Sequence, residues 1–497
     1  MQTLVAGLDL GSTGIKLLVL DEQGREVALS RVPTPWQEQA DGAIVLTEAT
    51  LVEAVHEVLD DTARQLGAHT GQGPDPGQAP GAGTTLADVR QPRTDARQPR
   101  ADDTAATPRV EVLSVTGMGE SGFLVGPDDR VLAPAFAWFD RSGQEAADAL
   151  PEDLRAQFPG RTGLPWGVQV SAAKIAHLRD QGTPVADARW LSLPEFVVHA
   201  LGGPVVAERS LAARTGLLEV ETGEVWPELL EHLGLSEHVV PTLVDAGTPV
   251  GRVDPARVPA PFSEARLSVA GHDHLVSSLS GDRASSHETP AASADVDGGA
   301  PEARYHVSLG TAEVLLRVLD TPLDFEARSR LGAYLINCVP HVVPGRWVVV
   351  AGVKTGLLMR RALTLLGMGD EPSRRALDEA VLALPPGAGS TAGIGVTGAR
   401  NDDGELRLRI GTDDVSPALL MRAVLEHGNE EIARLIEVMD AELPPATSSL
   451  LTGGWTSWAS VREARGRVLP GLEVSHRSQD TAYGAAVSAL SQGLARR

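Results

Sequence analysis

The sequence predicts an α/β fold, because short apolar strands alternate with amphipathic helices along most of its 497 residues. A second observation is an internal repeat: GLDLGSTGIKLLVLD at 7–21 is echoed by HVSLGTAEVLLRVLD at 306–320. Each copy predicts a strand, a tight turn with glycine and a second strand. We therefore expect a duplicated fold in which two hairpin loops face each other across a cleft, with chance similarity of apolar strands as the alternative.

The elements follow from their patterns. Apolar runs predict strands at 3–10, 16–21 and 110–117. Residues 46–67 repeat apolar side chains at helical spacing, with Thr47 as the expected N-cap. Later helices are expected at 357–367 and 416–440.

Two segments carry too few bulky apolar residues to offset the entropy of ordering. Residues 68–109 contain only Leu86 and Val89 of that kind, and residues 282–303 contain only Val296. We expect 68–109 to be a disordered insertion and 282–303 a flexible one. The RQPR that occurs twice in the first could instead be a basic docking motif. The chain then divides into an N-terminal domain, 1–281, and a C-terminal domain, 304–497.

Composition narrows the partners and the compartment. The 43 basic and 66 acidic residues give a net charge of −23, which argues against nucleic acid and anionic membranes as partners. A phosphate ligand stays compatible, because backbone N–H groups can bind it. The one cysteine, Cys338, precludes a disulfide framework and is expected to be buried. Without a signal-peptide pattern or a membrane span, we expect a cytoplasmic protein.

The two Gly-Ser/Thr turns favour phosphate binding. Such turns expose backbone N–H groups and short hydroxyls in one concavity, and two of them could hold a polyphosphate from both sides. Asp9 lies at the end of the first strand, where its carboxylate could hold Mg²⁺. The alternative for Asp9 is a turn-capping role.

A candidate base lies in VAGHDHLVSSLSG, residues 269–281. Asp273 follows an apolar strand, a position from which a carboxylate can take a proton from an acceptor hydroxyl. His272 and His274 flank it. With no third ligand at a telling spacing, the two histidines favour a polar cleft lining over a zinc site.

These segments together resemble the FGGY carbohydrate kinases, of the sugar kinase/actin/chaperone superfamily. The resemblance covers most of the chain outside the two insertions, and its first phosphate motif has the form common among xylulose kinases. The segments that resemble the family, in its order, are GLDLGSTGIK, VTGMGESGFLVGPDDRVLAPAFAWFDRSGQEA, RTGLPWGVQVSAAKIAHLRD, ERSLAARTGLLEVETGEVWPELLEHLGL, VAGHDH, VSLGTAEVLL, and LLTGGWTSW with DTAYGAAVSAL.

The resemblance implies two ribonuclease-H-like (actin-like ATPase) domains that close on a sugar and on ATP with Mg²⁺. It implies Asp273 as the general base and as a substrate contact, and Asp9 as the residue that organises the metal. Sugar-pocket residues implied are Glu120, Trp138 and Asp140, although Trp138 could equally be a core aromatic. Residues implied to contact ATP are Gly11, Ser12, Thr13, Lys16, Gly310, Thr311, Gly453 and Gly454.

Departures from the family pattern leave the substrate open. Arg141 in WFDRS comes one place early, and Gly119 stands where glycerol kinases carry an arginine before the glutamate. Trp455 replaces a small residue in the adenosine turn and could stack on adenine or narrow the site. The favoured acceptor is a ketopentose such as xylulose. The alternatives are a glycerol- or tetritol-type polyol kinase, a non-catalytic regulator and a chaperone-type ATPase. Homodimers are common in this family, which is an analogy only.

Overall fold

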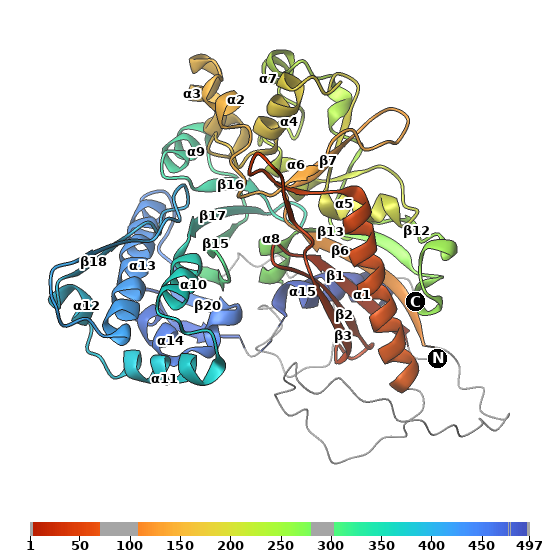
Figure 1. Cartoon of the computed structure of the whole chain (residues 1–497). Coiled ribbons are helices and arrows are strands. Elements are labelled where there is room, and N and C mark those ends of the chain that lie inside the picture. The colour runs from red at the N-terminus through yellow and green to blue at the C-terminus, as the bar shows by residue number, and fades with distance from the viewer. Residues whose placement is uncertain (1–2, 70–107, 280–302, 476, 478, 495–497) are drawn as a thin grey trace, which may run out of the picture.

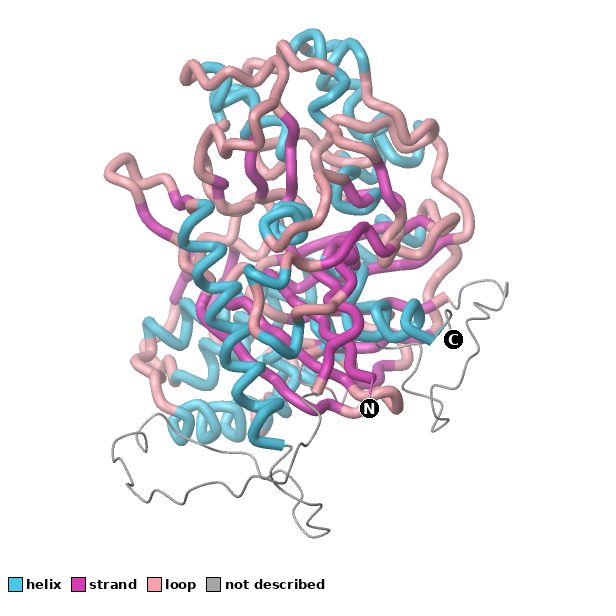
Figure 2. Tube along the Cα trace, turned by 90° about the vertical axis from the view of Figure 1, so that its right-hand side faces the viewer, coloured by secondary structure: helices cyan, strands magenta, loops and turns pink. Residues whose placement is uncertain are grey.

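The structure, a computed structural model, describes residues 3–69, 108–279, 303–475, 477 and 479–494. Two six-stranded sheets form its centre, one from each part of the chain (Figure 1). In the tube view, the strands gather in the interior with helices around them (Figure 2). The predicted insertions lie outside the described residues, apart from a few residues at their ends.

The first sheet has the order β12-β13-β6-β1-β2-β3. β1 runs antiparallel to β2, and β2 antiparallel to β3, whereas β1, β6 and β13 are parallel. Its strands are β1 (Thr3–Leu10), β2 (Gly14–Leu20), β3 (Glu26–Pro33), β6 (Arg109–Gly117), β12 (Pro249–Arg252) and β13 (Arg266–His272). The three strands predicted from the sequence are all present in this sheet.

The second sheet has the order β16-β17-β15-β14-β20-β21. β14 runs antiparallel to β15, and β15 to β17, whereas β14, β20 and β21 are parallel. Its strands are β14 (Arg304–Leu309), β15 (Glu313–Leu319), β16 (Asn337–Pro340), β17 (Trp347–Val353), β20 (Ser448–Thr452) and β21 (Leu472–Val474). The pairing order β3-β2-β1-β6-β13 is thus repeated as β17-β15-β14-β20-β21, so the internal repeat does mark a duplicated fold.

Two helices pack on the first sheet, each chiefly against different strands. α1 (Glu48–His69) packs on β3 and β2, and Thr47 caps it by accepting the Thr50 N–H at 3.3 Å. α15 (Asp480–Leu494) packs on β1 and β6, where Gly7 gives Ala482 and Ala486 room to approach the strand. The end of the chain therefore returns to the N-terminal sheet. The boundary at 304–497 stays a prediction, and these contacts favour assigning α15 to the first domain.

The second sheet is covered by helices from the C-terminal part. α10 (Thr355–Leu365) and α13 (Pro417–Asp440) pack together, as expected for the helices predicted at 357–367 and 416–440. α11 (Glu371–Leu382) and α14 (Ala459–Arg465) pack beside them. Cys338 is buried, as predicted. In the part of the chain that is described, no helix is long and apolar enough to cross a membrane.

The remaining elements are peripheral or connect the sheets. The helices are α2 (Gln144–Asp148), α3 (Glu152–Thr162), α4 (Ser171–Asp180), α5 (Leu193–Ala200), α6 (Arg209–Arg214), α7 (Pro227–Leu233), α8 (Asp273–Ser278), α9 (Phe325–Gly332) and α12 (Ala388–Thr391), with 3-10 turns η1 (Glu237–Val239), η2 (Pro255–Arg257), η3 (Ala260–Phe262) and η4 (Gly454–Ser457). The short strands are β4 (Gln37–Glu38), β5 (Ile44–Leu46), β7 (Gly122–Val125), β8 (Ala135–Phe136), β9 (Arg189–Ser192), β10 (Ala207–Glu208), β11 (Leu243–Val244), β18 (Ile394–Thr397) and β19 (Arg407–Ile410).

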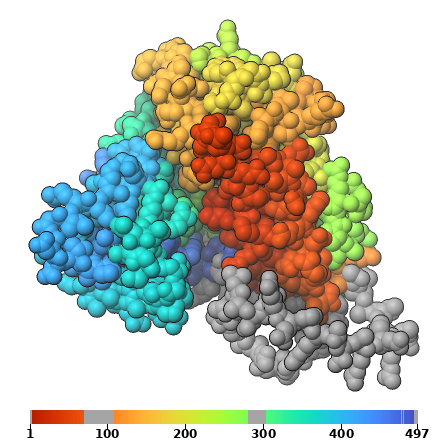
Figure 3. Space-filling model, viewed as in Figure 1, coloured from red at the N-terminus to blue at the C-terminus, as the bar shows by residue number. Residues whose placement is uncertain are grey.

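The space-filling view shows the surface hollowed between the N-terminal segment, in red, and the helices of the C-terminal part, in cyan (Figure 3).

Candidate active site

Three neighbouring parallel strands end at the same edge of the first sheet. Leu10 near the end of β1 pairs with Gly117 of β6, which also pairs with His272 of β13. The segments that follow are the first hairpin loop, the stretch that reaches Glu120, and the helix that begins at Asp273. Because parallel strands deliver the segments after them to one edge, these distant parts of the sequence lie together.

The first hairpin loop is held from one side. The Thr34 hydroxyl donates to the carbonyl of Gly11 at 2.6 Å, and the Trp36 indole N–H donates to the carbonyl of Ser12 at 2.8 Å. The N–H groups of Ser12 and Thr13 find no acceptor among the residues that the structure describes. A loop with fixed carbonyls and free N–H groups is suited to an anion such as phosphate.

Asp9 is buried beside this loop. Lys16 is its partner across the β1–β2 ladder, with Nζ 3.6 Å from Asp9 Oδ2. Burial raises the pKa of Asp9 to about 6, Lys16 opposes that shift, and the negative charge of Asp273 adds to it. Asp9 and Asp273 thus lie close enough to repel each other, which is an arrangement that a bound cation relieves.

Asp273 is the first residue of α8. Its Oδ1 accepts the N–H of His274 at 2.7 Å and lies 3.6 Å from His272 Nδ1. The preceding backbone is fixed, because the His272 N–H donates to Ser210 Oγ at 3.0 Å. Gly271 has φ of 104°, and a Cβ there would lie 2.8 Å from Ser210 Oγ, so only glycine fits this approach.

Glu120 forms a buried ion pair near Asp273. Arg214, the last residue of α6, donates from Nε at 2.8 Å and from Nη2 at 2.5 Å to the same oxygen, Oε1. The other oxygen, Oε2, lies 3.8 Å from His272 Nε2. Burial opposes the negative charge, but Arg214 and His272 together hold the pKa of Glu120 well below its usual range. Glu120 is therefore a fixed carboxylate.

Arg214 is a residue of this site that sequence reasoning missed. It comes from ERSLAARTG, in which Glu208 accepts the N–H groups of Ser210 and Leu211 and so caps α6. A Cβ at Gly119 would lie 2.6 Å from Arg214 Cγ, so the missing side chain at 119 makes room for this arginine. Arginines stand at both ends of this helix, Arg209 and Arg214, and nothing in the sequence shows which of them has a buried partner 94 residues away.

Trp138 is half-buried, and it packs partly on the first core and partly on other aromatic rings. It lies edge-on to Phe139 with ring centroids 5.5 Å apart. The ammonium of Lys354, from the C-terminal part, lies 5.9 Å from the centre of the Trp138 ring. The ring thus contacts both parts of the chain, which fits a wall of the cleft as well as a packing role.

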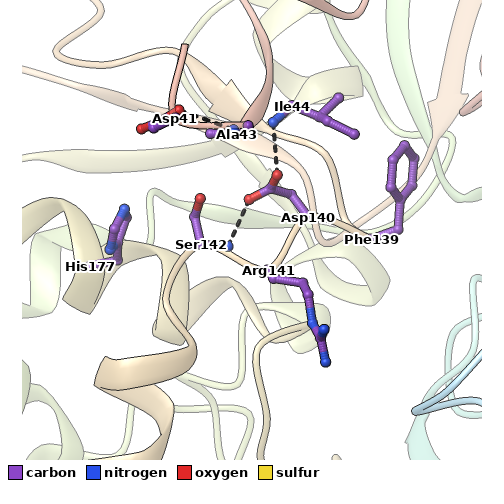
Figure 4. A pocket seen from close by; sticks show the side chains of 9 residues that line it. Asp41, Ala43, Ile44, Phe139, Asp140, Arg141, Ser142 and His177 are labelled. Atoms are coloured by element: carbon purple, nitrogen blue, oxygen red, sulfur yellow. Dashed lines mark hydrogen bonds between the residues drawn. The ribbon is translucent and has the colours of Figure 1, made fainter. Parts of the chain in front are cut away.

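Asp140 has its own hydrogen-bond partners, separate from the ion pair of Glu120 and Arg214. Its oxygens accept the N–H of Ile44 at 2.7 Å and of Ser142 at 2.7 Å, and Lys174 Nζ donates at 2.6 Å to the carbonyls of both Asp140 and Ser142. In the described part of the chain it has no hydrogen bond or ion pair with Glu120 or Asp273. A close-up shows its carboxylate turned toward the backbone in a surface pocket (Figure 4). That pocket is lined by Asp41, Gly42, Ala43, Ile44, Phe139, Asp140, Arg141, Ser142 and His177.

The second sheet offers an equivalent edge. β14 and β20 are parallel and end side by side, with Ser308 paired to Thr452. The second hairpin loop, with Gly310 and Thr311, and the turn at Gly453 therefore lie next to each other. Gly453 has φ of 102° and presses on the backbone of Leu309, where a Cβ would meet the main-chain nitrogen at 2.9 Å.

The two glycines of this turn differ in their surroundings, because Gly453 packs against Leu309 and Gly454 faces open space. A Cβ at Gly454 would meet nothing within 4 Å. Trp455 and Trp458 pack edge to face with ring centroids 5.6 Å apart, and both pack on the core of the second part. The turn is thus open at Gly454 and supported by aromatic packing behind it.

The residues present fit a magnesium ion carried by a nucleotide. Mg²⁺ in such sites takes one or two carboxylates and completes its shell with phosphate oxygens and water. Asp9 supplies a buried carboxylate whose pKa is raised by burial, so a nearby cation would favour its charged form. Among the described residues no group of three or more His, Cys, Asp or Glu could hold a metal. The chain by itself therefore offers a partial ligand set.

Comparison with known proteins finds similarity to carbohydrate kinases. Residues 102–280 match the N-terminal domain of the FGGY family of carbohydrate kinases. A xylulose kinase of Klebsiella pneumoniae is 24% identical over 469 residues, which cover 90% of this chain and 81% of that protein. An L-fuculokinase of Salmonella typhi is 24% identical over 154 residues, 30% of this chain, and the match spans only 33% of that enzyme.

Solved structures agree on the fold. A gluconate kinase from Lactobacillus acidophilus superposes with a TM-score of 0.75 over 99% of this chain and 90% of its own, at 17% identity. A xylulose kinase from the same organism gives 0.75 over 100% of this chain and 90% of its own, at 16% identity. The predicted pair of ribonuclease-H-like domains is confirmed by these superpositions together with the repeated sheet topology. The chain is therefore similar to the FGGY carbohydrate kinases, in sequence over residues 102–280 and in fold over nearly its whole length.

Proposed function

We propose that this chain transfers the terminal phosphoryl group of ATP to a hydroxyl group of a small sugar or polyol, with a ketopentose such as xylulose as the favoured acceptor. The observation that carries the proposal is the convergence of the first hairpin loop, Glu120 and Asp273 at one edge of the first sheet. Phosphoryl transfer requires fixed donors around the phosphate and a group that receives the acceptor's proton, and this edge offers both.

Asp273 is the proposed general base. One carboxylate oxygen, Oδ1, is used by the N–H of His274, so Oδ2 is the oxygen that would receive the proton of the acceptor hydroxyl. The Asp273 side chain is 18% exposed, which leaves it accessible from the cleft. Burial lowers the pKa of His274, so this neighbour favours its neutral form and does not compete as a cation for the carboxylate.

The nucleotide is proposed to lie between the two hairpins. Its phosphate oxygens would accept hydrogen bonds from the loop of Gly11, Ser12 and Thr13 and from that of Gly310 and Thr311. Lys16 would add positive charge on the first side, and the adenosine would pass Gly453 and Gly454. Asp9 would hold Mg²⁺, which when bound neutralises phosphate charge.

The acceptor is proposed to lie against Trp138 and to donate a hydroxyl hydrogen bond to Glu120. The pairing of Glu120 with Arg214 supports this role, because it keeps the carboxylate charged and in one orientation. Asp140 is better suited to holding the wall of the pocket in place, since backbone N–H groups occupy its oxygens. Of the two acids expected in the sugar pocket, Glu120 is therefore the one we assign to the acceptor.

The preference for a ketopentose is supported by the extent of the similarities. The likeness to the xylulose kinase covers 90% of this chain, whereas that to a glycerol kinase of Thermococcus gammatolerans covers 29%. A polyol such as glycerol or a tetritol is the second candidate, because a fixed glutamate would accept a hydroxyl hydrogen bond from either class of acceptor.

A screen for ADP release tests the proposal. The purified chain would be incubated with Mg²⁺ and ATP and with ketopentoses, tetroses, polyols and aldonic acids in turn. Turnover is expected to depend on the acceptor and to be fastest with a ketopentose. ADP release of equal rate without an acceptor would indicate an ATPase instead. Calorimetric binding of a sugar without ADP release on any acceptor would indicate a non-catalytic regulator.

A further inference from the structure

Lys354 lies beside the second hairpin. It follows β17, whose last residue Val353 pairs with Glu313 at the start of β15, and it precedes α10. Two residues later, Gly356 packs directly on the carbonyls of Gly310 and Thr311, where a Cβ would clash. The backbone that follows Lys354 therefore packs against the loop that we propose to hold phosphate.

The end of the same side chain reaches the other part of the chain. Lys354 Nζ lies 5.9 Å from the centre of the Trp138 ring, which is the proposed wall for the acceptor. A second contact nearby also joins the two parts, because Gln169 Nε2 donates to the carbonyl of Asn401 at 3.3 Å. Lys354 thus links the backbone beside the second hairpin with the proposed acceptor wall.

The charge of Lys354 is not paired. Within the described residues, its ammonium forms no ion pair and no hydrogen bond, although the side chain is half-buried. Asp402 and Asp403 are the nearest acids that influence it, and they are paired with Arg400 at 3.2 Å and Arg407 at 2.6 Å.

The surroundings of Lys354 favour an anionic ligand. Burial lowers its pKa, the negative charges of Asp402 and Asp403 oppose that shift, and the positive charges of Arg361 and Arg141 add to it. A half-buried cation with no anionic partner is unfavourable, and an anion that arrives in the cleft would remove that penalty.

We propose that the ammonium of Lys354 binds the phosphoryl group that passes from ATP to the acceptor, as a catalytic residue contributed by the C-terminal part of the chain. This inference rests on the proposed kinase function. The bond between the terminal phosphorus and the bridging oxygen of ATP breaks, and a bond between that phosphorus and the acceptor oxygen forms. The hydroxyl proton passes to Asp273, ADP leaves, and Lys354 keeps its proton throughout. Its charge stabilises the oxygens of the group in transit.

Binding of two nucleotides separates this role from a structural one. Lys354→Met would be compared with the parent chain for its affinity toward ADP and toward a non-hydrolysable imido analogue of ATP, each with Mg²⁺. The affinity for the analogue is expected to fall by about 10-fold or more, since one charge-assisted hydrogen bond to the terminal phosphate is lost. The affinity for ADP, which lacks that group, is expected to stay within about 2-fold.

Two further variants control the experiment. Lys354→Arg keeps the charge and is expected to recover part of the lost affinity. Arg360→Met removes one positive charge from an exposed position of α10, the helix that follows Lys354, and is expected to change neither affinity. Equal losses for ADP and the analogue, or no loss for either, would overturn the proposal.

A turnover measurement completes the test. In Lys354→Met, kcat is expected to fall by about 100-fold while KM for the acceptor changes little, as for an interaction made in the transition state. A rise in acceptor KM alone would mean that Lys354 binds the acceptor and would overturn the proposal. If the parent chain phosphorylates no acceptor, the proposed function fails, but the nucleotide comparison still decides whether Lys354 reads the terminal phosphate.

Discussion

The two hairpins share a topology and differ in charge. Aligned through the repeat, Asp9 of the first hairpin corresponds to Ser308 of the second, and Lys16 corresponds to Leu315. The first edge also carries Glu120 with Arg214 and the candidate base Asp273. The loop of the second edge is built from glycines and short side chains, and Glu313 beside it forms a buried ion pair with Arg465. Lys354 comes from beside this hairpin rather than from within it.

This difference indicates a division of roles within one repeated fold. Both edges can offer backbone N–H groups to phosphate, because the strand and turn geometry is the same. The first edge brings together three carboxylates, Asp9, Glu120 and Asp273, and the charge of Asp273 acts on the pKa of Asp9. We therefore expect substitution of the acids at the first edge to affect chemistry, and substitution in the turn at Gly453 to affect nucleotide binding.

The most direct test of this comparison replaces Asp9 and Ser308, the two residues at corresponding positions, one at a time. Asp9→Asn is expected to lower kcat by about 100- to 1,000-fold, because the proposed carboxylate ligand of the metal is lost. Ser308→Ala, at the corresponding place in the second hairpin, is expected to stay within about 3-fold. Steady-state rates at saturating ATP and Mg²⁺ measure both, and equal losses would contradict a division of roles.

Arg214 tests the fixed carboxylate of the first edge. Arg214→Met leaves Glu120 buried without its main partner, so KM for the acceptor is expected to rise by about 30-fold or more. Arg209→Met, in the same helix but exposed, is the matched control. Kinetics over a range of acceptor concentrations would check this, and a KM that moves equally in both variants would remove Glu120 from the acceptor site.

The junction between the two parts predicts a pH effect. His341 follows β16, accepts the Val343 N–H on Nδ1 at 3.1 Å, and lies with Nε2 3.1 Å from Ser278 Oγ of α8. Burial lowers the pKa of His341 to about 3, with His306 and Arg346 acting in the same direction. A second proton would go to Nδ1, where it would oppose the Val343 N–H.

Stability should therefore fall in acid through this residue. Its pKa is lower in the folded chain than in the unfolded one, so below pH 6.5 the unfolded chain binds the additional proton, and at pH 5 this costs about 2 kcal/mol. In His341→Gln the loss of melting temperature between pH 6.5 and 5 is expected to be smaller than in the parent. Replacing the exposed His238 by Gln should leave the loss unchanged. Parallel curves for parent and His341→Gln would refute the effect.

The smallest expected effects lie in the adenosine turn. Gly453→Ala is expected to weaken ADP binding by about 10-fold, since alanine tolerates neither φ of 102° nor the contact with Leu309. Gly454→Ala, into open space, should change it by no more than about 2-fold. Calorimetric titration with ADP distinguishes the two variants. Similar losses of ADP affinity would mean that the ligand contacts the turn at both positions.

Much of the fold could be predicted because its signals are local. The repeat of the hairpin was visible in the letters, and Thr47 could be placed at the start of α1 from its own neighbours. The ends of β1, β6 and β13 then bring Asp9, Glu120 and Asp273 together by sheet topology alone.

The partners of individual side chains could not be predicted in the same way. The pairing of Arg214 with Glu120 depends on the space left by Gly119, and the bond from Ile44 to Asp140 spans 96 residues. The packing of α15 on the first sheet likewise joins segments that lie far apart in the sequence. The roles of the site residues stay predictions until they are tested in solution.

The central claim is that Asp273 activates the acceptor and takes no part in holding the nucleotide. Asp273→Asn, with exposed Asp60→Asn as its control, tests this by measuring kcat and the dissociation constant of ADP on the same preparations. We expect kcat to fall by about 1,000-fold while ADP affinity stays within about 2-fold. Retained turnover, or a parallel loss of ADP affinity, would contradict the account.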